Sequence, residues 1–88
     1  MLFRSRSKLA QSLGLKAAAE RYAAFLDLVP SLIAREARGM SGAQRDRALD
    51  AYARARKTSA LAPRLSLDPA ATAFQLGSIL ASVASLKR

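Results

Sequence analysis

The sequence predicts an all-α protein, a small helical bundle of three main helices. Apolar residues recur at helical spacing over residues 16–38, a glycine and a serine interrupt the pattern near residue 40, and residues 69–86 contain no charged side chain. With 88 residues, of which 51% are hydrophobic, the chain can form one domain over residues 1–88 with a modest core. Alanine supplies much of that hydrophobic fraction, so we expect few large side chains in the core.

The uncharged stretch predicts the central helix, over about residues 69–87. Asp68 can cap its first N–H groups, and Pro69 suits the first helical position because its missing donor is not needed there. The large apolar residues share one side of this helix: Leu76, Ile79, Leu80, Val83 and Leu86. Small residues form an adjoining strip: Ala73, Gly77, Ala81 and Ala84. We therefore expect this helix to be buried nearly all round, with a close helix contact along the small residues.

The length of the same stretch raises the question of a membrane span. Its 18 uncharged residues are near the lower limit for crossing a bilayer. Serine, threonine, glutamine and glycine dilute it, and only six of its residues are large and apolar. We therefore expect no transmembrane span.

A single apolar stripe predicts a helix over about residues 16–38. Its members fall within about a third of the helix circumference. They are Leu15, Ala18, Ala19, Tyr22, Phe25, Leu26, Val29, Ile33 and Ala37. Pro30 removes one backbone donor, so we expect the helix to be kinked or divided close to Val29. Gly39 then ends the helix.

Residues 42–58 predict the next helix, which begins with a capping box formed by Ser41 and Gln44. Its apolar stripe is narrow: Ala48, Leu49, Tyr52, Ala53 and Ala55. On the exposed side, Asp50 and Arg54 have the spacing of a favourable ion pair. Residues 59–68, which include Pro63 and alternating leucines, predict an extended linker that dips into the bundle.

The N-terminal residues 1–15 are basic, and the first acidic side chain of the protein is Glu20. We expect a basic arm that becomes ordered on a partner, or a short helix over residues 7–13 that Gly14 stops. A composition rich in arginine, serine and leucine is also typical of a mitochondrial presequence. Organellar targeting is therefore an alternative to a cytoplasmic location.

Residues 33–49 resemble a DNA-binding helix-turn-helix motif. The likeness rests on the Ile33–Ala34 opening, the turn at Gly39 and the capping Ser41. Arg45, however, stands where the motif has an aliphatic residue, and the first alanine is displaced by one position. Two helices joined by a short glycine turn are therefore the favoured interpretation of this segment.

The residue types disfavour catalysis. The chain has no cysteine and no histidine, so it cannot form a disulfide, a thiolate or imidazole metal site, or the usual nucleophile–base pairs. Its six acidic residues are dispersed, and Asp46 with Asp50, one turn apart, would make a poor divalent-ion site. We expect a protein that is not an enzyme and that holds no cofactor or metal.

The charge balance indicates an anionic partner. Fifteen Lys and Arg against six Asp and Glu give a formal net charge of +9, and eleven of the cations are arginine, which suits bidentate contact with phosphate. We predict binding to nucleic-acid phosphates without sequence preference, alone or within a nucleoprotein assembly. The predicted binding residues are Arg45, Arg47, Arg54, Arg56 and Lys57 on the helix over residues 42–58, with Arg4, Arg6 and Lys8 on the N-terminal arm. Tyr22 and Tyr52 lie on apolar stripes, so we expect them in the core rather than stacked on bases.

Two other functions fit the same composition. A protein-interaction adaptor or inhibitor module would dock on an acidic protein surface and complete its small core there. A peripheral membrane or organellar subunit would use residues 1–26 as a membrane-surface helix. A homo-oligomer, or a subunit of a larger complex, is compatible with all three functions. The sequence names neither the partner nor the oligomeric state.

Overall fold

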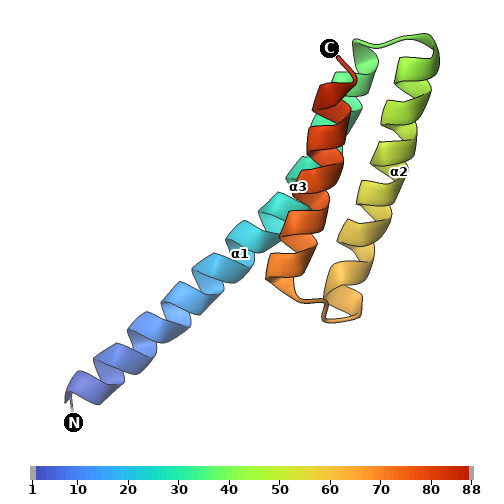
Figure 1. Cartoon of the computed structure of the whole chain (residues 1–88). Coiled ribbons are helices and arrows are strands. Elements are labelled where there is room, and N and C mark those ends of the chain that lie inside the picture. The colour runs from blue at the N-terminus through green and yellow to red at the C-terminus, as the bar shows by residue number, and fades with distance from the viewer. Residues whose placement is uncertain (1, 88) are drawn as a thin grey trace.

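Three helices arranged side by side make up the protein. The computed structural model describes the backbone of residues 2–87 and the side chains of residues 8–87. In chain order the helices are α1 (Leu2–Arg38), α2 (Gly42–Arg64) and α3 (Pro69–Ser85), and no strand occurs among the residues described (Figure 1). The predicted all-α bundle of three main helices is confirmed.

α1 and α2 form an antiparallel hairpin, and α3 runs back along both of them (Figure 1). The side chain of Ser59 in α2 contacts the backbone of Leu26 in α1, although 33 residues separate them. Such side-by-side helices differ from the steep crossing of a helix-turn-helix motif, and Arg45 is exposed rather than packed between them. The segment over residues 33–49 is therefore the simple pair of helices that the sequence favoured.

The first helix is much longer than the other two, and its N-terminal half extends away from the bundle (Figure 1). Its 37 residues correspond to about 55 Å at 1.5 Å per residue. The whole molecule measures 64 × 23 × 15 Å, so this helix sets its long dimension. Tyr22 is the first residue of α1 that packs against the core among those described. We call residues 2–21 the arm and residues 22–38 the packed half of α1.

The core lies between the packed half of α1 and α3, and α2 supplies mainly alanines to it. The largest fully buried side chains are Val29, Ile33, Leu76 and Val83. The buried residues of α2 are Ala48, Ala51, Ala55 and Ala62. Because each of these side chains is a single methyl group, α2 can approach both neighbours closely.

The predicted apolar stripe of α2 differs from the structure at three residues. Leu49 is 44% exposed and Ala53 is exposed too, while Ala51, which the prediction omitted, is buried. The buried alanines follow the helical period along the side that faces α1 and α3. The narrow space on that side accommodates methyl groups, so α2 turns Leu49 toward solvent.

Pro30 is buried inside α1, which continues through it without a division. A proline has no N–H, so the carbonyl of Leu26, four residues earlier, lacks its helical donor. The hydroxyl of Ser59 donates a hydrogen bond to that carbonyl at 2.7 Å. Of the two expected outcomes at Pro30, a kink or a division close to Val29, the division does not occur, and α2 supplies the donor that proline lacks.

Three helix boundaries differ from the prediction. The first helix begins at Leu2 and passes through Gly14, so the start near residue 16 and the stop at Gly14 are wrong. The second continues to Arg64, so most of the predicted linker over residues 59–68 is helical. The third ends at Ser85, two residues earlier than expected.

The turn after α2 explains why its end was missed. Ser66 has a φ of 49°, and the N–H of Leu67 donates to the carbonyl of Ala62 at 3.0 Å. This is the Schellman arrangement, in which the left-handed residue is usually a glycine. Because a serine takes that place, the usual sequence signal for a helix end is missing.

The predicted start of α3 is confirmed, whereas its predicted burial is wrong. The Asp68 carboxylate accepts a hydrogen bond from the N–H of Ala71 at 2.9 Å, and Pro69 begins the helix. On the outer side Phe74 is 78% exposed, and no atom lies within 4 Å of a Cβ added to Gly77. A helix in a three-helix bundle has only two neighbours, so its third side faces solvent. No helix among the described residues combines the length and the apolarity needed to cross a membrane.

The end of α3 is attached to the other two helices. Lys87 forms an ion pair with Glu36 of α1. Gln44 at the start of α2 donates a hydrogen bond to the carbonyl of Leu86. The predicted capping box is therefore wrong, because the Gln44 side chain is used on α3 and Ser41 makes no side-chain capping bond.

Candidate functional site

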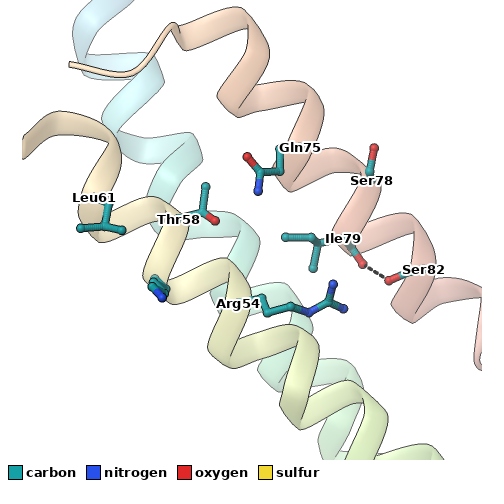
Figure 2. Close-up of a pocket in the computed structure, with 8 residues that line it drawn as sticks. Arg54, Thr58, Leu61, Gln75, Ser78, Ile79 and Ser82 are labelled. Carbon is teal, nitrogen blue, oxygen red and sulfur yellow. Dashed lines mark hydrogen bonds between the residues drawn. The ribbon is translucent and has the colours of Figure 1, made fainter. Parts of the chain in front are cut away.

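A groove between α2 and α3 gathers basic side chains on one side of the bundle. Its first part has a volume of about 530 Å³, and Arg54 and Lys57 of α2 line it. The opposite wall belongs to α3 and carries uncharged polar groups: Gln75, Ser78 and Ser82. Figure 2 shows Arg54 extending from α2 toward Ile79 and Ser82 on α3.

The groove continues toward the end of α3. An adjoining hollow of about 640 Å³ is lined by Arg47, Asp50, Ala53, Arg54, Ser82 and Leu86. Arg54 and Ser82 line both parts, so we treat them as one surface and call it the α2–α3 groove. Its charged lining residues are Arg47, Arg54 and Lys57 against Asp50, three cations minus one anion, which gives a local charge of +2.

The helical period of α2 explains why these cations share a side. Arg47 and Arg54 are seven residues apart, which is close to two full turns, and Lys57 follows Arg54 by nearly one turn. The predicted Asp50–Arg54 ion pair does not form, since within residues 8–87 the structure has one ion pair, Lys87 with Glu36. The guanidinium of Arg54 is therefore available to a ligand.

The α3 wall is polar without being charged. The hydroxyl of Ser78 donates to the carbonyl of Phe74 at 2.9 Å, and that of Ser82 donates to the carbonyl of Ile79 at 2.6 Å. Their protons are thus used by the helix itself, and the oxygens keep lone pairs that accept hydrogen bonds. Cations on one wall and small polar groups on the other suit the binding of an anionic group that also carries hydrogen-bond donors.

The other predicted residues lie elsewhere. Arg56 is on the opposite flank of α2, where with Asp27 and Tyr52 it lines a hollow of about 360 Å³ between α1 and α2. Its guanidinium carbon lies 5.9 Å from the centre of the Tyr52 ring, and Nη1 donates to the tyrosine hydroxyl at 3.4 Å. The charges of Arg56 and Asp27 cancel, so this hollow is not a basic surface.

The eight predicted binding residues therefore do not form one site. Arg47, Arg54 and Lys57 come together in the α2–α3 groove. Arg45 is exposed, and Lys8 is exposed on the arm. The side chains of Arg4 and Arg6 lie outside the described residues, and their backbone is part of the arm, which extends away from the bundle (Figure 1).

The polar residues of α3 are the part of the groove that the sequence prediction missed. Gln75, Ser78 and Ser82 recur at intervals of three and four residues, so they share one side of the helix. That spacing was visible in the sequence, but nothing in it indicated that this side would face the arginines of α2.

Among the described residues, no three acidic side chains come together in a way that would hold a metal ion. Tyr52 is half-buried against the core, whereas Phe74 is the most exposed large apolar side chain described. Tyr22 and Tyr52 thus pack against the core, as expected, and the exposed aromatic side chain is that of Phe74.

Comparison with known proteins adds no family to this description. The chain matches no protein-family model, no curated protein and no solved structure. The structure defines a class, a three-helix bundle with one basic groove and a long projecting helix, and its function has to be argued from those features.

Proposed function

We propose that this protein is a non-catalytic binder of nucleic-acid phosphates, acting alone or within a nucleoprotein assembly, and that the α2–α3 groove is its binding surface. The observation that carries the proposal is the convergence of Arg47, Arg54 and Lys57 on one groove that holds a single acid, Asp50. None of these three cations is neutralised by an ion pair in the described part of the chain.

The geometry suits a phosphate backbone. From Arg47 to Lys57 the row of cations follows α2 for about 15 Å, which covers several consecutive phosphates of one strand. An arginine can hold a phosphate with two parallel hydrogen bonds, and lysine adds a point charge. Contacts of this kind fix the position of the nucleic acid without reading its bases.

The decisive variant is Arg47→Glu with Arg54→Glu, which changes the groove charge by minus four. We expect affinity for duplex DNA and for RNA to fall for every sequence tested. The dependence of log affinity on log salt should become shallower by about 0.9 for each phosphate of duplex DNA that the variant no longer neutralises. Fluorescence anisotropy at several salt concentrations measures both quantities, and a circular-dichroism melt checks that the fold is retained.

The matched control is Arg45→Glu with Arg56→Glu, on the same helix but outside the α2–α3 groove. It changes the net charge by the same minus four, so a diffuse attraction between a basic protein and DNA would weaken equally in both variants. A much larger loss from the groove variant supports the proposal. Equal losses, or no binding by the unmodified protein at low salt, would contradict it.

The protein-interaction alternative has its own supporting observation. The outer side of α3 carries Phe74, which is 78% exposed, and no charged residue occurs between Pro69 and Leu86. An adaptor would use such a side against another protein. Purification of the tagged chain with and without nuclease distinguishes the two, since a protein partner remains after nuclease treatment and fails to bind Phe74→Glu.

A further inference from the structure

The arm of α1 is the largest part of the molecule that the bundle does not cover. It carries three exposed leucines, Leu9 at 61%, Leu13 at 59% and Leu15 at 72%. The α2–α3 groove lies on the bundle, so the arm plays no part in the function proposed above. A helix of about 20 residues without tertiary contacts is marginally stable in water. Exposed leucines on such a helix indicate that it binds a surface outside this chain, which would cover them.

The exposed leucines lie on two different sides of the helix. At 3.6 residues per turn, Leu9 and Leu13 are one turn apart and point about 160° away from the line through Val29 and Ile33 that faces the bundle. Leu15 continues that bundle-facing line instead. A broad surface can therefore contact Leu9 and Leu13 while α2 and α3 remain on the far side of α1.

The charge of the arm selects the chemistry of that surface. Residues 1–19 contain four cations and no acid, a local charge of +4. The two described members, Lys8 and Lys16, are exposed. Beyond residue 19, the next charged residues on the same side of α1 as Leu9 and Leu13 are Glu20 and Asp27. Both are acidic and exposed. An anionic surface would therefore be attracted along residues 1–19 and repelled on this side from Glu20 onward.

We infer that the arm is an interfacial helix that lies flat on an anionic lipid surface, with Leu9 and Leu13 inserted among the acyl chains and Lys16, which the helical period places on the same side, beside the headgroups. Three observations carry this assignment together: exposed leucines on the side opposite the bundle, a local charge of +4 over residues 1–19, and the acids from Glu20 onward that limit the contact to those residues. Leucines on one side combined with cations around them are the features by which helices bind membrane surfaces.

The test uses the full chain and sedimentation with vesicles of equimolar phosphatidylglycerol and phosphatidylcholine, compared with vesicles of phosphatidylcholine alone. Leu13→Glu is compared with Leu15→Glu. Both variants place one negative charge on the same arm at an exposed position, so they weaken the electrostatic attraction equally and differ only in the side of the helix. We expect Leu13→Glu to reduce binding to anionic vesicles about tenfold or more, and Leu15→Glu to reduce it much less.

A second measurement does not depend on loss of binding. The chain has no tryptophan, so Leu13→Trp and Leu15→Trp each introduce a unique fluorescent probe. On addition of the anionic vesicles, the emission of the residue-13 probe should shift to shorter wavelength because the indole leaves water, while the residue-15 probe should change little.

Four results would overturn the inference. The first is absence of binding to anionic vesicles, and the second is equal binding to neutral ones. The third is equal loss from Leu13→Glu and Leu15→Glu. The fourth is a dimer in light scattering that only Leu13→Glu dissociates, which would identify a second copy of the chain as the occupant. None of these results affects the duplex-binding test of Arg47 and Arg54, so the two proposals can fail separately.

Discussion

The two halves of α1 belong to one continuous helix and have opposite environments. In the packed half, Val29 and Ile33 are 1% and 0% exposed, whereas in the arm Leu13 and Leu15 are 59% and 72% exposed. Both halves are rich in alanine and leucine and have the helical period. The comparison teaches that the period determines the helix, while the neighbours determine whether an apolar residue on it contributes to folding.

Leu15 makes this contrast sharpest. It lies on the same line along the helix as Ile33, eighteen residues or five full turns later. Ile33 belongs to the buried core, whereas Leu15 is 72% exposed on the arm, which extends away from the bundle (Figure 1). Three pairs of substitutions test how far the arm and the bundle are energetically separate.

The largest expected effect comes from truncating the same kind of side chain in each half. Ile33→Ala removes a fully buried residue and should lower the free energy of unfolding by about 2–5 kcal/mol. Leu15→Ala should change it by less than about 0.5 kcal/mol, because the side chain is already in water. Urea denaturation followed by circular dichroism measures both. A cost of several kcal/mol for Leu15→Ala would show that the arm is packed in solution.

An intermediate effect is expected at the hydrogen bond that joins α2 to the packed half. Ser59→Ala removes the donor to the Leu26 carbonyl and leaves that acceptor unsatisfied, which should cost about 1–2 kcal/mol. In a Pro30→Ala background the restored N–H can donate to the same carbonyl, so Ser59→Ala should then cost clearly less.

A double-mutant cycle of denaturation free energies gives this coupling directly. Pro30→Ala has its own cost, because the proline ring is buried, and the cycle removes that term. Equal costs for Ser59→Ala in the two backgrounds would mean that Ser59 does not compensate for the proline.

The smallest effect compares two glycines that are both inside helices and both surrounded by open space. No atom lies within 4 Å of a Cβ added to Gly14 or to Gly77. Gly77→Ala in α3 should raise the free energy of unfolding by up to about 1 kcal/mol, because alanine has the higher helix propensity. Gly14→Ala should leave it unchanged, since the arm is not coupled to the bundle.

Hydrogen exchange distinguishes this explanation from a simple absence of effect. Gly14→Ala should slow amide exchange within the arm alone, because it stabilises the local helix. Should Gly14→Ala raise the midpoint of the global transition as much as Gly77→Ala, the arm and the bundle would unfold as one unit.

Several features of the fold follow from the sequence alone because they depend on neighbours along the chain. Three such local features are present in the structure: the helical period over residues 16–38 and 42–58, the Asp68 cap, and Pro69 at the first position of α3. The connection near Gly39 was also found, because a glycine next to a cap residue marks the end of one helix and the start of another.

The errors arose where a distant segment decided the outcome. Gln44 was expected to cap its own helix and instead bonds the carbonyl of Leu86, which the sequence places 42 residues away. For Pro30 the sequence predicts a kink or a division of α1; the helix continues undivided, and Ser59, from another helix, supplies the missing donor. Neither partner is identifiable before the helices are placed side by side.

The binding surface likewise has one part that the sequence determined and another that only the tertiary structure decided. The sequence determined that α2 carries an excess of arginine and that Arg47, Arg54 and Lys57 share one of its sides, because the helical period depends only on spacing. Only the tertiary structure decided that Ser78 and Ser82 of α3 face them and that Arg56 is turned toward α1. The sequence likewise determined that residues 1–19 of the arm contain no acid. Only the tertiary structure decided how far the arm extends beyond the bundle and on which side Leu13 is exposed. Both depend on where α2 ends and α3 begins, because the burial of a residue depends on which helices lie alongside it.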